Sequence, residues 1–181
     1  KQHRPLVDAQ FCVNTDAGGG HIKNGKHVYM AMQAAEKVFL SFKLEVTNNA
    51  GHSSLPVKDN AIYHLADGLS RLGKFDFPVH LFDVTRAAFE RGANIYGGQL
   101  GADLKTMVQN SGDAAAIARL SAIPVYNAQM RTTCVATMLS GGHAENALPA
   151  LASAVVNCRL LPVDKPADVK RMLQEVLADP K

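Results

Sequence analysis

Cysteine is scarce in this sequence of 181 residues. Cys12, Cys134 and Cys158 are an odd number, and no two of them have the C-x-x-C spacing. The pattern argues against both a disulfide framework and a zinc ribbon. We therefore expect buried free thiols, which pack like small apolar side chains.

Long apolar runs and basic clusters are also missing. No apolar run is long enough to span a membrane. The formal net charge is only +3 and no basic cluster stands out, so a nucleic-acid partner is not indicated. The chain begins at Lys1 rather than at methionine and shows no signal peptide, so we expect an excised piece. The sequence gives no sign of a cellular compartment.

The composition that remains is typical of a globular protein, with 47% hydrophobic and 19% charged residues. The first apolar segment, Leu6–Asn14, is typical of a buried strand and leads into a glycine-rich loop that contains Asp16. In α/β proteins ligands bind at the C-terminal ends of such strands. The alternative is that Asp16 only caps a turn.

Two further segments alternate between apolar and polar residues. Val28–Gln33 is a weak strand, and Val38–Asn48 is a strong one whose apolar side chains all fall on one face. Alternation with a period of two predicts a sheet that is covered on one side only. A bend at 35–37 connects the two strands, so we expect them to form a hairpin.

A loop with His52, Asn49–Pro56, precedes an amphipathic helix predicted from about Asn60 to Leu72. Asp59 is a suitable N-cap, and Gly73 takes the usual C-terminal position. The apolar residues recur at helical spacing and form one stripe: Ile62, Leu65, Ala66, Leu69 and Leu72. Leu65 should lie deep in the core.

Residues 75–130 follow a less regular helical pattern. Three candidate helices are separated by Gly97-Gly98, Ser111-Gly112 and Pro124. They span Val84–Arg91, Leu100–Gln109 and Asp113–Ile123. No catalytic motif occurs here, so we expect a helical insertion between two parts of one sheet domain.

The last part of the chain returns to strands. Thr132–Leu139 and Leu151–Leu161 flank a loop that contains Asn146. The even positions of the second strand are apolar, which predicts that Arg159 points away from the core. Asp164 should cap a final helix that has Pro166 in its first turn.

This order of elements predicts an α+β fold, a ferredoxin-like two-layer sandwich. Its antiparallel sheet would have about four strands with two helices on one face, plus the helical insertion. Such a fold needs one more strand after the last helix. We therefore expect Val28–Gln33 to lie antiparallel against Val38–Asn48 and to complete a four-stranded sheet.

Four stretches in this order resemble one enzyme family: Asn14–Gly20, Gly51–Pro56 with Asn60–Ile62, Gly141–Pro149 and Asn157–Arg159. The chain is similar to zinc-dependent exopeptidases and amidohydrolases that include aminoacylase, glutamate carboxypeptidases and succinyl-diaminopimelate desuccinylase. The resemblance implies that residues 1–20 are a leader from the catalytic domain. Residues 21–181 would then be the lid or dimerisation domain, interrupted by the insertion at 75–130.

The resemblance also implies two zinc ions in the whole enzyme, a metallopeptidase or amidohydrolase. Asp16 matches one of the metal ligands of the family. The H-x-D motif and the Glu-Glu pair that the family needs are missing from this sequence. Since each zinc ion takes about three protein ligands, we expect no zinc pair in this fragment and no activity from it alone.

By the same resemblance, His52 would stabilise the oxyanion, reaching into the site of a neighbouring subunit. Asn146 would hold the same region of the substrate, and Arg159 would bind its terminal carboxylate with two hydrogen bonds. The implied substrate is a peptide or an N-acyl amino acid, and the implied assembly is a homodimer formed through the lid.

Local alternatives exist for each of these residues. His52 could be bonded to a neighbouring serine, Asn146 could be a turn residue, and Arg159 could pair with a surface acid. A non-enzymatic alternative also exists for the whole chain, because fold does not decide function. It is a ferredoxin-like dimerising module or a module that binds a small anion.

Overall fold

The computed structural model describes residues 3–10 and 18–179. The chain divides into two compact units, residues 1–35 and 36–181. The first unit contains a short helix, α1 (Arg4–Val7), and a hairpin of two antiparallel strands, β1 (Gly18–Lys23) and β2 (Lys26–Met32). Asn24 and Gly25 connect the strands with positive φ angles of 52° and 74°. This is the geometry that favours Asn-Gly in a two-residue hairpin turn.

Two predictions for this unit are wrong. The segment Val28–Gln33 pairs with β1 and not with Val38–Asn48, because the Asn-Gly turn brings the preceding strand back onto it. The segment Leu6–Asn14 is not the predicted strand, since Leu6 and Val7 are helical and no strand covers residues 8–10. The rest of that segment lies outside the described residues, as does Asp16.

The second unit contains a three-stranded antiparallel sheet in the order β3-β7-β5. Its strands are β3 (Val38–Thr47), β5 (Thr133–Gly141) and β7 (Leu151–Leu160). The prediction of four strands is therefore wrong for the described part of the chain, and β3 and β5 are the two edges of the sheet. The register of β3 and β7 runs without a break from Val38↔Leu160 to Thr47↔Leu151.

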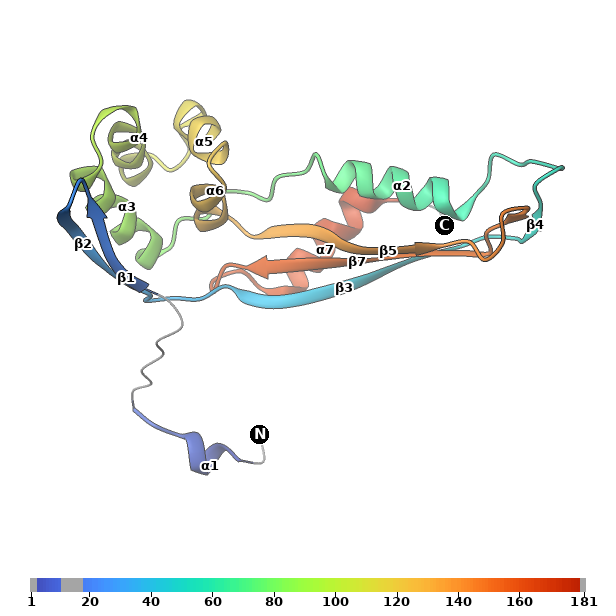
Figure 1. Cartoon of the computed structure of the whole chain (residues 1–181), viewed down its shortest axis with the longest axis horizontal. Helices are drawn as coiled ribbons and strands as arrows, with labels where there is room; N and C mark the ends of the chain where they lie inside the picture. The colour runs from blue at the N-terminus through green and yellow to red at the C-terminus, as the bar shows by residue number, and fades with distance from the viewer. Residues whose placement is uncertain (1–2, 11–17, 180–181) are drawn as a thin grey trace. The chain divides into compact units, whose positions relative to one another are not determined.

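Two helices, α2 (Ala61–Leu72) and α7 (Pro166–Leu177), cover one face of this sheet (Figure 1). Every second residue of β7 is buried against them, as the alternation predicted: Ala152, Ala154, Val156, Cys158 and Leu160. Leu65 is only 4% exposed, which confirms its predicted place in the core.

The predicted caps of these two helices differ from the observed ones. The side chain of Asn60, not of Asp59, caps α2 by accepting a hydrogen bond from the Ile62 N–H at 2.9 Å. The cap position of α7 is Lys165. The carboxylate of Asp164 instead accepts a hydrogen bond from Thr132 and lies 2.9 Å from His80 Nδ1.

Four helices form the insertion: α3 (Asp83–Ile95), α4 (Gly98–Gln109), α5 (Ala114–Ser121) and α6 (Pro124–Met130). The first three match the predicted helices. The fourth was missed because Pro124 was interpreted as a breaker, whereas proline is well suited to the first helical position. The insertion has a core of its own: Phe89, Leu104, Met107, Ala116, Leu120 and Met130.

One buried charge stabilises the insertion. Asp103 is 3% exposed and accepts two hydrogen bonds from Arg119, at 2.7 and 2.8 Å. The Arg119 guanidinium lowers the pKa of the Asp103 carboxyl.

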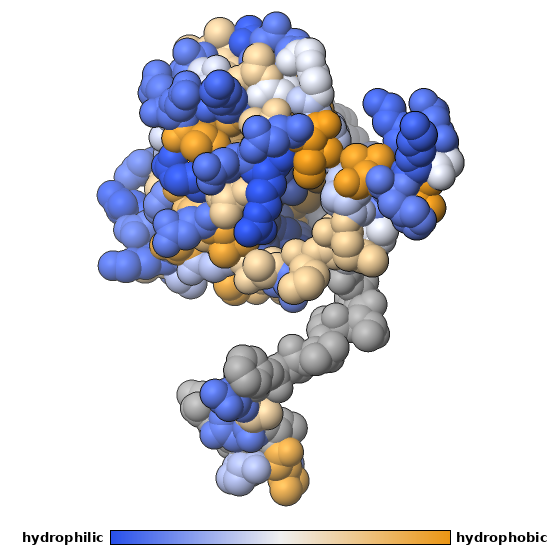
Figure 2. All heavy atoms as spheres, turned by 90° about the vertical axis from the view of Figure 1, so that its left-hand side faces the viewer, coloured by the Kyte–Doolittle hydropathy of each residue, from blue (hydrophilic) through white to orange (hydrophobic). Residues whose placement is uncertain are grey.

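The molecular face shown in Figure 2 is largely hydrophilic, with hydrophobic residues in small separate groups.

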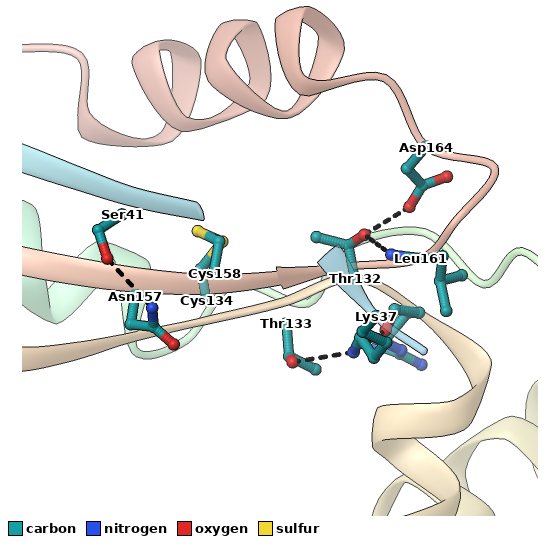
Figure 3. Close-up of a disulfide and its surroundings, with 10 residues drawn as sticks. Lys37, Ser41, Thr132, Thr133, Cys134, Asn157, Cys158, Leu161 and Asp164 are labelled. Carbon is teal, nitrogen blue, oxygen red and sulfur yellow. Dashed lines mark hydrogen bonds between the residues drawn. A yellow bond between two sulfur atoms is a disulfide. The ribbon is translucent and has the colours of Figure 1, made fainter. Parts of the chain in front are cut away.

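Cys134 and Cys158 form a disulfide, which contradicts the expected free thiols (Figure 3). The two residues are direct partners in the register of β5 and β7, and their Cα atoms are 4.1 Å apart. Directly opposite residues in an antiparallel pair can approach this closely. The spacing of 24 residues gave no sign of the bond because the register, and not the sequence distance, brings the sulfur atoms together.

We expect the disulfide to add about 3 kcal/mol to the free energy of unfolding, because it closes a loop of this length in the unfolded chain. Urea unfolding of Cys134→Ala should therefore show a loss of that order, and Cys12→Ala is the control that keeps the bond. In denaturant without reductant, only the Cys12 thiol should react with a thiol reagent. Three reactive thiols per chain would contradict the assignment.

Candidate functional site

His52 belongs to a short two-stranded ribbon that lies beyond the last residue of β3 and the first residue of β7. Figure 1 shows β4 at this end of the sheet. The ribbon pairs β4 (Gly51–His52) with β6 (Ala147–Leu148), so that His52 is opposite Ala147. The Ser53 N–H donates to the Asn146 carbonyl at 2.9 Å. The structure therefore brings His52 and Asn146 to the same tip, and both are exposed there.

The hydrogen bonds of His52 orient its ring. The Ser54 N–H donates to Nδ1 at 3.2 Å, and the Ser54 hydroxyl lies 2.8 Å from the same nitrogen. An Nδ1 that accepts a backbone hydrogen bond carries no proton, so the neutral ring carries its proton on Nε2. The hydrogen bond to a neighbouring serine, the alternative explanation for His52, is therefore present. It leaves the Nε2–H directed away from Ser54 and available as a donor.

His64 ties the end of this loop to the helical layer. Its Nε2 lies 2.8 Å from Asp59, at the end of the His52 loop, and its Nδ1 lies 3.1 Å from Asp179, beyond α7. The hydrogen bonds with Asp179 and Asp59 raise the pKa of His64. Both contacts are strongest with the imidazolium, which donates from both ring nitrogens.

Arg159 lies at the opposite end of β7, on the face that the helices leave open. Its side chain is exposed while Cys158 and Leu160 are buried, which confirms the predicted direction. Its cross-strand partners are Phe39 on β3 and Thr133 on β5. The guanidinium carbon lies 4.8 Å from the centroid of the Phe39 ring.

The two groups of predicted site residues are therefore far apart within one chain. Arg159 pairs with Phe39 near the start of β3, and the ribbon with His52 follows Thr47 at its end. Eight residues of extended strand separate these positions, which corresponds to roughly 26 Å at about 3.3 Å per residue. A single small substrate cannot contact both groups of one copy.

Lys37 fixes the Arg159 end of the sheet to the insertion. Its amine donates to the carbonyls of Ala128 and Arg131, at 2.9 and 2.8 Å, and to the Thr133 hydroxyl at 3.1 Å (Figure 3). Burial lowers the pKa of Lys37 from 10.5 to about 8; the Asp164 charge opposes this shift, and the Arg159 charge adds to it. No sequence motif pointed to Lys37 or Phe39. The available signal was an aromatic residue on the otherwise polar face of β3.

The free edge of β5 carries apolar side chains. Val135, Met138 and Leu139 are each 60% exposed or more. Leu139 also lines an apolar groove of about 370 Å³ between the end of β5 and α2. Ile62, part of the predicted apolar stripe of α2, lies in this groove and is 41% exposed. The stripe is thus covered by the core over only part of its length.

The described part of the chain contains neither a cluster of metal-ligating side chains nor a helix that could span a membrane. In residues 3–10 and 18–179, no three His, Cys, Asp or Glu side chains come together in a group that could hold a metal ion. The proposed ligand Asp16 lies outside these residues. None of the described helices combines the length and the apolar character needed to cross a lipid bilayer.

Comparison with known families gives a match to the peptidase dimerisation domain of the M20 peptidases over residues 34–181. The chain is 27% identical over 162 residues to the N-fatty-acyl-amino acid synthase/hydrolase PM20D1 of Mus musculus, covering 88% of this chain and 32% of that protein. It is 30% identical over 146 residues to a probable carboxypeptidase S-like 2 of Dictyostelium discoideum, covering 80% of this chain and 27% of that protein.

Among solved structures, an M20 family metallo-carboxypeptidase, Sso-CP2 of Sulfolobus solfataricus, is similar with a TM-score of 0.46 and 17% identity. The match covers 78% of this chain and 40% of that chain. The present chain spans about a third of the length of the curated relatives named above.

The lowered pKa of Lys37 predicts a pH dependence of stability. The unfolded chain holds the Lys37 proton up to about pH 10.5, whereas the folded chain releases it near pH 8. Raising the pH through this window should therefore stabilise the wild type relative to Lys37→Met, with no such change below about pH 8. Urea unfolding of both proteins from pH 7 to 10.5 measures the difference, and parallel curves would contradict it.

Proposed function

Because the chain belongs to the peptidase dimerisation domain family of the M20 peptidases, we propose that it is the lid of a larger hydrolase. The enzyme would be a zinc-dependent metallopeptidase or amidohydrolase that cleaves an amide bond in a peptide or an N-acyl amino acid. Residues 21–181 would form the lid, and residues 1–20 a leader from the catalytic domain. The names of the similar proteins, an N-fatty-acyl-amino acid synthase/hydrolase and a probable carboxypeptidase, support this substrate class.

The ferredoxin-like sandwich belongs to the same proposal. Without the insertion and the two-residue strands β4 and β6, the elements of the second unit follow one another as β3, α2, β5, β7 and α7. The third strand of this series, β7, lies between the first two in the sheet. Strand-helix-strand-strand-helix with this order is the beginning of the ferredoxin-like pattern, and both helices lie on one face.

The proposed mechanism follows from the distance between Arg159 and the tip that contains His52 and Asn146. Since one copy cannot direct both groups at one small substrate, each site would combine Arg159 of one copy with His52 and Asn146 of a second. A two-fold axis that pairs two β5 edges antiparallel places Thr133 of one copy near Gly141 of the other. The Arg159 end of each sheet then faces the tip of its partner.

The free β5 edge and its groove support this pairing. An edge strand offers unpaired backbone groups that a second strand can complete. The exposed apolar side chains along it, and the partly uncovered stripe of α2, would be buried by the same contact. A homodimer would therefore pair the free backbone groups of the β5 edge and would also bring the two separated groups of site residues together.

Each residue would act by its own chemistry. The His52 Nε2–H would donate to the amide oxygen on which negative charge develops, an interaction that is stronger in the transition state than in the ground state. The Asn146 amide would bind the same region of the substrate. Arg159 would bind the terminal carboxylate in a two-pronged contact.

Two zinc ions are proposed for the whole enzyme. The described residues of this chain do not offer a ligand set for them. Asp16 is the one residue of this sequence proposed as a ligand, and it cannot hold a metal pair by itself because each zinc ion takes about three protein ligands. The remaining ligands would come from other segments of the proposed enzyme.

Kinetics of the enzyme that contains this chain test the roles. His52→Ala should lower kcat by about 10²–10³-fold, because it removes a contact to the developing oxyanion. Arg159→Ala should mainly raise KM, because its contact to a carboxylate exists in the ground state. Effects of the opposite kind would contradict the assignment. Binding of carboxylates without any hydrolysis would favour the anion-binding alternative.

The proposed dimer is tested by charge on the β5 edge. Leu139→Asp places a carboxylate in the apolar contact and should shift the protein from dimer to monomer in sedimentation velocity at micromolar concentration. Val38→Asp is a matched control, since Val38 is also an exposed apolar residue but lies on β3, the opposite edge of the sheet. A wild type that remains monomeric would rule out the pairing.

A further inference from the structure

Phe39 is a large aromatic residue that lies on the open face of the sheet and is not part of the hydrophobic core. It is 61% exposed, and it shares this open face with the polar residues of β3. Its direct partner across the strands is Arg159, whose guanidinium carbon lies 4.8 Å from the ring centroid. This separation is within the range of a favourable cation–π contact.

An aromatic partner holds an arginine differently from an acidic one. A carboxylate would occupy two of the five N–H donors of the guanidinium, whereas a ring attracts the cation by its quadrupole and occupies none of the in-plane donors. Among the described residues, the contact found for the Arg159 side chain is the one with Phe39, and no ion pair accompanies it. The contact thus restrains the cation and leaves its donors free.

The surroundings of Arg159 make such a restraint necessary. Lys37 is close enough for the two positive charges to influence each other, and its amine is fixed by hydrogen bonds to Ala128, Arg131 and Thr133. An unrestrained arginine would move away from this charge into solvent. Two-pronged binding of a carboxylate is stronger when the guanidinium is held in place before the ligand arrives, because less conformational entropy is then lost on binding.

We propose that Phe39 is a positioning residue for substrate binding, whose ring holds the Arg159 guanidinium over the open face with its donors free for a carboxylate. The inference rests on the proposed function, in which Arg159 binds the terminal carboxylate. Phe39 itself acts through Arg159. A purely structural role in the β3–β7 pairing would change stability without changing the preference for a free carboxylate.

The first test observes the contact directly in this chain by nuclear magnetic resonance. The Nε–H proton of Arg159, identified by its loss in Arg159→Lys, should be shifted upfield by the ring current of Phe39. The shift should persist in Phe39→Tyr, which keeps the ring, and disappear in Phe39→Leu, which keeps only apolar bulk. An unshifted proton in the wild type would overturn the proposal.

The second test uses the enzyme that contains this chain and two substrates, one with a free terminal carboxylate and its carboxamide. For the carboxylate, Phe39→Leu should raise KM about two- to five-fold with kcat unchanged, a range that corresponds to the loss of one exposed cation–π contact. Phe39→Tyr should restore the wild-type KM. For the carboxamide, which makes no charged contact with Arg159, the three proteins should have the same KM.

The outcomes separate this inference from the proposed function. If Arg159→Ala leaves the KM for the carboxylate unchanged, the proposed function fails, and the role of Phe39 fails with it. If Arg159→Ala raises that KM and Phe39→Leu does not, only the role of Phe39 is overturned. Equal effects of Phe39→Leu on carboxylate and carboxamide would likewise overturn it, because they would show a general loss of structure.

Discussion

The register of β7 between β3 and β5 is the constraint on which the rest of the second unit depends. One alternation buries Cys158 and Leu160 under the helices and directs Arg159 to the open face. The same register places Cys134 opposite Cys158, where the disulfide covalently joins the edge strand to the central one. A shift of one residue would reverse every side chain, so the disulfide fixes the faces of β5 as well as its position.

The straight, continuous pairing of β3 and β7 also keeps the two groups of site residues apart. Arg159 cannot approach His52 unless this ladder breaks, because ten consecutive residue pairs connect the two ends. A rigid separation of this kind is useless to a monomer that binds one small substrate. It suits a proposed dimer in which two β5 edges pair antiparallel, because the Arg159 end of each copy then lies near the His52 tip of the other. The free β5 edge and the divided site would thus have a common explanation.

Much of the second unit could be predicted from the sequence because its signals are local. Alternation identified the faces of β3 and β7, and helical spacing identified α2 and α7. The wrong predictions with the largest effect on the topology concern non-local pairing. The partner of β2 was decided by the turn at Asn24-Gly25, and the partner of Cys134 was decided by strand register. For the candidate site, ordered motifs predicted His52, Asn146 and Arg159, and their roles stay predictions. The distance between Arg159 and the other two residues, and the contact of Arg159 with the Phe39 ring, could be known only from the three-dimensional structure.

The central claim is that each proposed site takes Arg159 from one copy and His52 from the other. Mixing the variants His52→Ala and Arg159→Ala of the whole enzyme, with exchange of subunits, tests it most directly when the substrate concentration is low enough that each variant alone has little activity. A mixed dimer would then contain one site with both changes and one site with neither, so random mixing should restore about a quarter of the wild-type activity. If both groups act within one copy, every site keeps one defect, and a mixture no more active than its components would contradict the account.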